Sequence, residues 1–219
     1  MVTFENVKNN ESVKIYIERA DASLKALGYT EHSYAHVGTV AVRASELLRE
    51  LGYGERTVEL TKIAAHLHDI GNVVNRVDHS QSGALIAFRI LDKLGMDASE
   101  IAEIVTAIGN HDEGTGVPVS VLAAALIIAD KSDVRRTRVR NNDFSTFDIH
   151  DRVNYSVTES ELALKDGKKT VALYLTVDTS IGSIMDYFEI FLTRMKLCRQ
   201  AAEFLGLKFE LFINGQRFS

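Results

Sequence analysis

Cysteine, proline and tryptophan are almost missing from this sequence. Its 219 residues include one cysteine, one proline and no tryptophan. A lone Cys198 excludes the disulfide frameworks of small secreted proteins. Because Cys198 lies in a run of helix-forming residues, we expect it to be a small buried hydrophobic residue. A chain without disulfides suits a reducing compartment, so the cytoplasm is the predicted location.

Long hydrophobic runs and an excess of positive charge are missing as well. The longest strongly apolar run, residues 121–129, has nine residues, whereas a membrane-spanning helix needs ~20. The first residues carry no basic segment with a following apolar stretch, so we expect neither a secretory signal nor a membrane partner. With 25 basic and 30 acidic residues, the net charge of −5 disfavours general nucleic-acid binding. The hydrophobic share of 46% excludes a disordered chain.

Most of the chain has the hydrophobic periodicity of α-helices. Between residues 11 and 140, apolar residues recur every three or four positions with almost no alternating stretch. The expected helices cover about residues 11–27, 30–52, 57–71, 80–94, 98–108 and 120–129. Asp97, with Glu100 three residues later, predicts a capping box at the fifth helix. The sixth helix is apolar nearly all round, so we expect it to be the buried central helix.

The periodicity changes near residue 150. Apolar residues take every second position over 171–177, as in a strand with one buried face. Residues 153–164 are expected to pair with this strand through an Asp-Gly hairpin turn at 166–167. A helix over 180–205 and a last strand over 207–213 complete a β-β-α-β unit.

The predicted fold class is therefore mainly α. We expect a helical bundle domain over residues 1–145 and a small C-terminal α+β unit over residues 146–219. An apolar stripe on the last helix and the final strand could support a homodimer, although the same pattern would serve an internal core.

Four of the seven histidines lie, with two aspartates, at predicted helix ends and loops. These six residues are His36, His68, Asp69, His79, His111 and Asp130. Imidazole nitrogens and carboxylate oxygens are the usual protein ligands of zinc, iron, manganese and related ions. Four histidines and two aspartates suffice for two metal ions, and the adjacent pair at 68–69 can contact different ions.

The order and local sequence of these residues resemble the HD superfamily of metal-dependent phosphohydrolases, over roughly residues 30 to 140. The matching segments include His36-Val37-Gly38-Thr39, His68-Asp69-Ile70-Gly71, His79-Ser80-Gln81-Ser82, Gly109-Asn110-His111 and Ala129-Asp130-Lys131. The resemblance implies an HD-domain helical bundle with divalent metal ions, two in the dinuclear branches, drawn from manganese, iron, magnesium, zinc and nickel. The implied ligands of the primary metal are His36, His68, Asp69 and Asp130. His79 and His111 would complete a second metal site or contact the substrate phosphate.

Two other histidines leave alternatives open. His32 lies four residues before His36 on the same helix face. It is therefore a competitor for the first ligand position, or a further ligand of the same cluster, and the spacing favours His36. His150-Asp151 repeats the His-Asp pair without its flanking series, and we interpret it as a chance match.

Basic residues follow the last aspartate. Lys131 is placed to contact a phosphate as a point charge, with a solvated lysine at the helix end as the alternative. Arg135 and Arg136, followed by two more arginines before residue 141, could hold a polyphosphate or nucleotide by bidentate contacts. The alternative for these arginines is plain surface charge.

Several branches of the family are disfavoured. Asn72 occupies a position that is often Lys in dinuclear members, which removes one candidate phosphate-binding cation. Residues 110–118 lack the motifs of the cyclic-di-GMP phosphodiesterases, and residues 70–73 lack the Glu-Asp pair of the alarmone hydrolases.

The leading hypothesis is hydrolysis of a phosphoester or phosphoanhydride in a small, nucleotide-like substrate. Asp69 would bridge two ions that activate a water molecule. Lys131 and the arginines would neutralise charge on the phosphoryl oxygens and the leaving group. The alternatives are a non-catalytic regulatory or interaction protein with a structural metal, and a di-iron oxygenase of the HD type.

Overall fold

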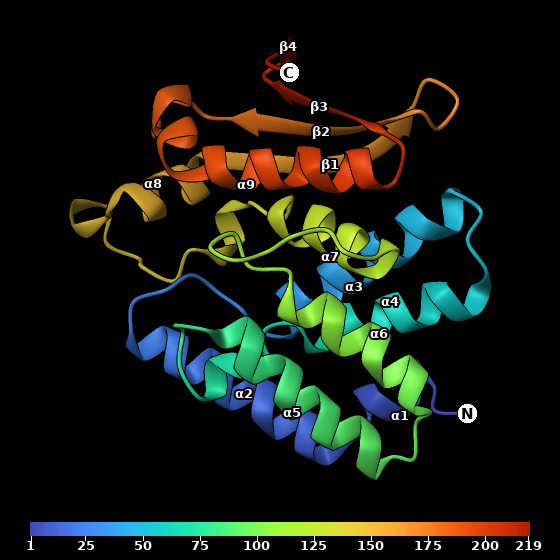
Figure 1. Cartoon of the computed structure of the whole chain (residues 1–219). Coiled ribbons are helices and arrows are strands. Elements are labelled where there is room, and N and C mark those ends of the chain that lie inside the picture. Colours follow the sequence, from blue (N-terminus) through green and yellow to red (C-terminus); the bar gives the residue numbers. More distant parts are fainter.

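Nine α-helices and one four-stranded sheet make up the protein, in a computed structural model that describes residues 1–219. Seven helices come first: α1 (Phe4–Lys8), α2 (Glu11–Ala26), α3 (Tyr34–Glu50), α4 (Glu55–Leu67), α5 (His79–Lys93), α6 (Ala98–Gly109) and α7 (Val121–Lys131). We call these seven helices the helical part. In Figure 1, α2 and α5 lie at the end of the molecule far from the sheet, and α7 lies beneath it. The predicted mainly helical fold class is confirmed.

The most apolar predicted helix is indeed the central one. Every residue of α7 from Leu122 to Ala129 is at most 1% exposed, as expected for a helix without a polar face. Ser120 begins this helix, and its hydroxyl accepts a hydrogen bond from the Ala123 N–H group at 3.1 Å. The helix ends at Lys131, so its last turn carries Asp130 from the hydrophobic interior to the predicted metal site.

Some helix ends differ from the sequence prediction. α3 begins four residues later and α4 ends four residues earlier than expected. The Asp97 side chain caps α6, but no capping box forms, because the Glu100 carboxylate pairs with Arg56 at 2.5 and 2.7 Å. The additional helix α1 has five residues, which is too short for a periodic pattern to show.

The C-terminal unit, residues 146–219, contains the sheet. Its elements are α8 (Ile149–Ser156), β1 (Val157–Lys165), β2 (Thr170–Val177), α9 (Ile184–Phe204), β3 (Lys208–Ile213) and β4 (Gln216–Arg217). The strand order is β1-β2-β3-β4. The hairpin turns at Asp166 and Gly167, both with positive φ, as predicted. Strands β2 and β3 are parallel, so α9 is the crossover between them.

The first predicted strand begins later than expected. Residues 153–156 lie in α8, whose first turn is capped by the Asp148 side chain. Strand β1 starts at Val157, which lies opposite Val177, the last residue of β2. Residues before Val157 would have no strand to pair with, so the chain satisfies their backbone groups in a helix.

The helical part and the C-terminal unit share one hydrophobic core. A single cluster of 51 buried residues includes side chains from both. Helix α9 lies between the sheet and α7 (Figure 1) and buries Phe191, Met195 and Cys198 of its predicted apolar stripe. The division into two domains near residue 145 stays a prediction. No helix combines the length and the hydropathy that crossing a membrane requires.

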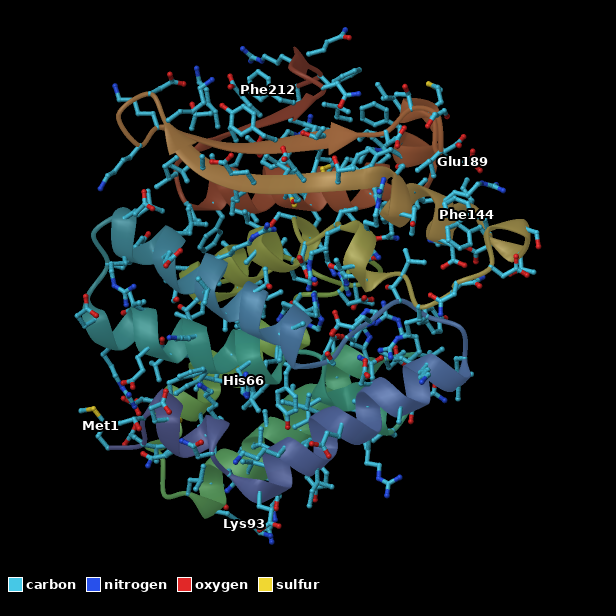
Figure 2. All side chains as sticks on the ribbon, turned by 180° about the vertical axis from the view of Figure 1, so that it is seen from behind. Met1, His66, Lys93, Phe144, Glu189 and Phe212 are labelled. Atoms are coloured by element: carbon cyan, nitrogen blue, oxygen red, sulfur yellow. The ribbon has the colours of Figure 1, made fainter.

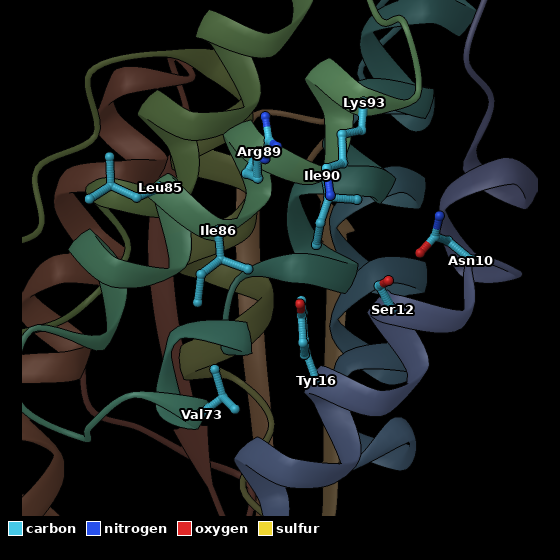
Figure 3. A pocket seen from close by; sticks show the side chains of 9 residues that line it. All are labelled: Asn10, Ser12, Tyr16, Val73, Leu85, Ile86, Arg89, Ile90 and Lys93. Atoms are coloured by element: carbon cyan, nitrogen blue, oxygen red, sulfur yellow. The ribbon is translucent and has the colours of Figure 1, made fainter.

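A surface cavity of about 380 Å³ separates part of α2 from α5. Figure 3 shows the side chains that line it, among them Tyr16 of α2 with Ile86 and Ile90 of α5. None of the six predicted metal ligands contributes to this cavity. This cavity is therefore separate from the predicted metal site.

Candidate metal centre

The structure brings together all six residues that the sequence predicts as metal ligands. Five helix ends supply them: His36 in the first turn of α3, His68 and Asp69 just after α4, His79 at the start of α5, His111 just after α6, and Asp130 in the last turn of α7. All four histidines are at most 2% exposed. We call these six residues the His/Asp cluster.

One close backbone approach sets the position of His79. A Cβ atom on Gly71 would lie 1.9 Å from the His79 carbonyl oxygen and 2.5 Å from the Gly83 backbone nitrogen. Gly71 belongs to the 3-10 turn η1 (Ile70–Val73), which directly follows Asp69. Only glycine allows this turn to contact the first turn of α5, and the contact brings His79 beside Asp69.

Asp69 lies between two groups of histidines. Its Oδ2 atom is 3.5 Å from His36 Nε2 and 3.3 Å from His68 Nε2. Its Oδ1 atom is 3.4 Å from His79 Nε2. The two carboxylate oxygens thus face different imidazoles, which is the arrangement of a bridging ligand.

Asp130 and His111 complete the two sides of the cluster. Asp130 Oδ1 is 3.3 Å from His36 Nε2 and 3.7 Å from His68 Nε2. His111 Nε2 is 3.2 Å from His79 Nε2. Two sets of three residues each have their ligand atoms within 4.8 Å of one another. One set is His36, His68 and Asp130, and the other is His68, Asp69 and His111. Either set could hold a metal ion.

Every histidine of the cluster contacts a protein acceptor through the same ring nitrogen, Nδ1. The Nδ1 atoms of His36, His68, His79 and His111 lie 2.6–3.1 Å from the Asp133 carboxylate and from the carbonyl oxygens of Ala65, Arg76 and Ile108, respectively. Since each partner is an acceptor, each Nδ1 carries the proton and donates it. The four Nε2 atoms therefore face the centre of the cluster, where Arg76 Nη1 lies 3.4 Å from His79 Nε2.

The free ring nitrogens fit a metal ion. His36 Nε2 and His68 Nε2 are buried and have no hydrogen-bond partner, although buried polar atoms are nearly always paired. His79 Nε2 and His111 Nε2 face each other, where two acceptor lone pairs would repel. A divalent cation with nitrogen and carboxylate ligands satisfies all four atoms at once.

The electrostatics of the cluster point the same way. Burial alone would lower the pKa of His68, but the carboxylates of Asp69 and Asp130 outweigh it and raise that pKa to about 10. Burial alone would raise the pKa values of both carboxyl groups, yet the neighbouring cations hold them well below their usual range. The cluster thus favours positive charge at its centre, where a metal ion would take the place of a proton.

Lys131 lies buried between two carboxylates. Its Nζ atom is 2.7 Å from Asp130 Oδ2 and 2.7 Å from Glu113 Oε2. Burial opposes the ammonium charge, but these two partners raise the pKa of Lys131. The side chain lines a small polar cavity over the cluster. Its role in catalysis and phosphate binding stays a prediction, now with the ammonium group held in a fixed place.

Arg135 and Arg136 do not line this small cavity. The guanidinium group of Arg135 pairs with Asp133 at 2.9 Å. Arg136 donates to the Tyr155 carbonyl oxygen at 2.8 Å and lies 3.7 Å from Asp178. Substrate binding by these two arginines stays a prediction, and their observed partners are protein groups.

The two remaining histidines of the sequence prediction lie in different places. His32 lines the small cavity beside Asp69, with its ring 5.4 Å from that of His36. Its role as a further ligand stays a prediction. His150 and Asp151 lie in α8, outside the His/Asp cluster.

Sequence reasoning missed three charged residues at the site. Asp133 holds His36, Glu113 holds Lys131, and Arg194 of α9 donates from Nε to Glu113 Oε1 at 2.9 Å. A signal for Arg194 exists, because it is a charged residue between Phe191 and Met195 of a buried stripe. No sequence pattern marks Asp133 as a site residue, although it lies three residues after the predicted ligand Asp130.

Comparisons with known proteins agree with this geometry. Residues 33–135 match the family model described as HD domain. The chain is also 25% identical, over 188 aligned residues, to an uncharacterized protein of Methanocaldococcus jannaschii, with 75% of this chain and 72% of that protein covered. The matched residues include the whole His/Asp cluster. Residues 33–135 of this chain are therefore similar to an HD domain.

Proposed function

We propose that the protein is a metal-dependent phosphohydrolase that cleaves a phosphoester or phosphoanhydride in a small, nucleotide-like substrate. The observation that supports this most is the convergence of four histidine Nε2 atoms around Asp69, with each ring fixed by an acceptor at Nδ1. The superfamily to which HD domains belong comprises metal-dependent phosphohydrolases, which gives the proposal its reaction class.

Two divalent ions are the proposed cofactors, since Asp69 directs one oxygen to each group of histidines. His36, His68 and Asp130 would hold one ion with Asp69, and His79 and His111 would hold the other. When bound, divalent ions supply Lewis acidity that polarises phosphoryl oxygens and makes water acidic enough to attack near neutral pH.

The protein's own polar groups orient the metal ligands and neutralise charge on the substrate. The Asp133 carboxylate and the carbonyl oxygens at Nδ1 fix the planes of the imidazole rings, which raises their basicity as ligands. Lys131, between Asp130 and Glu113, places a positive charge beside the cluster. Its positive charge would reduce the repulsion between the negative phosphoryl group and these two carboxylates.

Metal content and hydrolysis test the proposal together. We expect about two metal ions per chain by elemental analysis of freshly purified protein, and release of product from a bis-aryl phosphodiester or a nucleotide panel with added manganese. His68→Ala and Asp69→Ala are expected to lose metal and to lower turnover at least about 1,000-fold. Retained activity in either variant would overturn the proposal.

A matched control is available on the same helix. His66 is also a buried histidine of α4, at 4% exposed, but its ring lies edge-on to Phe4, 5.5 Å away, and outside the cluster. Figure 2 shows it among the helices, on the side away from the sheet that carries Phe212. His66→Gln should keep both metal and turnover. Metal without turnover on every substrate would favour a regulatory protein, and oxygen consumption by an iron-loaded form would favour an oxygenase.

A further inference from the structure

A polar cavity of about 570 Å³ adjoins the His/Asp cluster. It shares four lining side chains with the small cavity over the cluster, namely His32, Arg76, Arg138 and Arg194. Its size lies within the range of about 300–1,000 Å³ that is common for small-molecule sites. A ligand of this size in the larger cavity would therefore reach the metal centre at one end.

Arg194, on α9 of the C-terminal unit, is held in place with free donors. Its Nε atom donates to Glu113 at 2.9 Å, and its guanidinium carbon lies 4.5 Å from the centre of the Phe191 ring. The two Nη groups make no hydrogen bond to the protein, and the side chain is 25% exposed. A guanidinium group fixed on one edge and open on the other is arranged for bidentate binding of an oxyanion.

Arg138, in the 3-10 turn η2 (Arg136–Arg138), presents a second guanidinium group. Its Nε atom donates to the Glu31 carbonyl oxygen at 2.9 Å, and its Nη1 atom donates to the Asp133 carbonyl oxygen at 2.7 Å. The Nη2 group has no hydrogen-bond partner in the protein. Both arginines line both cavities, so their free donors lie where the metal centre meets the larger space.

Other side chains line the larger cavity alone. Asp148, Asp151 and Asn154 of the α8 region line it but do not line the cavity over the cluster. Asp151 takes one hydrogen bond from Asn141 through Oδ2, and the side-chain NH₂ group of Asn154 donates to the His150 carbonyl oxygen. Asp151 Oδ1 and Asn154 Oδ1 therefore remain as acceptors for donor groups of a ligand.

We propose that Arg194 and Arg138 bind a phosphate group of the substrate and that the acceptors of α8 bind hydroxyl groups of its organic part. This inference rests on the proposed function and assigns its substrate class: a phosphorylated, hydroxyl-rich small molecule such as a sugar phosphate or the ribose phosphate of a nucleotide. The C-terminal unit thus contributes to the substrate site, and Arg194 is a substrate-binding residue outside residues 33–135.

The first test measures anion binding and does not depend on turnover. Inorganic phosphate is titrated into the metal-loaded protein by calorimetry, with wild type, Arg194→Gln and Arg194→Lys compared. We expect Arg194→Gln to weaken phosphate binding about tenfold, with metal content and melting temperature unchanged. Arg194→Lys should recover only part of the loss, because lysine keeps the charge without the bidentate donors.

Arg199→Gln is the matched control, since Arg199 lies on the same helix, is 61% exposed and faces only Glu203. It should bind phosphate as the wild type does. Wild-type affinity in Arg194→Gln, an equal loss in Arg199→Gln, or loss of metal from Arg194→Gln would each overturn the role of Arg194.

The second test addresses the organic part. Wild type is expected to bind ribose 5-phosphate about tenfold more tightly than inorganic phosphate, and Asp151→Ala should remove that difference while leaving phosphate binding unchanged. An unchanged ratio in Asp151→Ala would overturn the assignment of α8.

If the protein binds phosphate through Arg194 but hydrolyses no substrate, the proposed function fails and the anion site stands. If hydrolysis proceeds with the same KM in Arg194→Gln, the anion site fails and the proposed function stands.

Discussion

The helical part and the C-terminal unit contribute opposite kinds of polar group to one site. The helical part supplies imidazoles that are almost fully excluded from water, and each has its Nδ1 atom occupied by an acceptor. The C-terminal unit supplies Arg194, which is a quarter exposed and has both Nη groups unpaired. One set of groups faces inward and is fixed through Nδ1, while the other faces a space that solvent can enter.

This difference separates two tasks. Groups that must hold the same ion through many turnovers gain from burial and from fixed hydrogen-bond partners, because both preserve their geometry. A group that binds and releases a substrate needs donors that are free between events. On the proposed function, the helical part binds the metal and the C-terminal unit supplies much of the substrate recognition.

The largest expected effect comes from Gly71→Ala, which attacks the geometry of the helical part. The new Cβ atom would lie 1.9 Å from the His79 carbonyl oxygen, so α5 or the 3-10 turn must move. We expect the free energy of unfolding in urea to fall by about 3 kcal/mol. Metal content should fall with it, because His79 moves relative to Asp69.

Gly38→Ala is the control for this substitution. Gly38 lies in α3, and a Cβ atom there would have no neighbour within 4 Å. Alanine should stabilise the protein by about 0.5–1 kcal/mol, because glycine disfavours a helix. If Gly71→Ala unfolds at the wild-type urea concentration, the close approach of these two segments does not position the site.

Asp133→Asn should weaken the metal centre. The buried Asp133 carboxylate lies 2.7 Å from His36 Nδ1 and orients that ring. Loss of its charge is expected to lower metal affinity by about 10- to 100-fold, as measured by competition with a chelator. Asp92→Asn, at an exposed position of α5, should have no effect. Unchanged metal affinity would show that His36 needs no partner.

Arg43→Met should weaken the connection between the two regions. Arg43 of α3 donates to the Ser132 carbonyl oxygen at 2.9 Å and to the Ser160 carbonyl oxygen of β1 at 2.5 Å. Removing these charge-assisted bonds should lower the free energy of unfolding by about 2 kcal/mol. Arg49→Met, at a 52% exposed position of the same helix, should change it by less than about 0.5 kcal/mol. Equal effects would mean that apolar packing alone joins the regions.

The helices could be predicted because their signals are local. The all-apolar sequence of α7 predicts a buried helix, and the Asp-Gly pair predicts the hairpin of β1 and β2. From the sequence alone, residues 153–156 are expected in the strand that pairs with residues 171–177. Their helical state depends on where β2 ends, at Val177, and no local pattern contains that information.

The cluster could be predicted for the same reason, and the recognition side could not. Each ligand of the His/Asp cluster lies within a short segment that marks a helix end. Arg194 reaches Glu113 across 81 residues, through the packing of α9 on α7. Such a contact depends on the tertiary fold, so spacing along the chain does not reveal it.

The smallest expected effect concerns Cys198, in the core where α9 meets the helical part. Its thiol is 0% exposed, and burial raises its pKa to about 12, above the ordinary value of 9.0. A raised thiol pKa favours the neutral form, so at pH 8 the reactive thiolate is rarer than for a free cysteine. The native protein should therefore resist an aromatic disulfide reagent at pH 8 and show one reactive thiol per chain in urea. Rapid labelling of the native protein would mean that α9 separates from α7 in solution, and Arg194 would then not be fixed beside the metal centre.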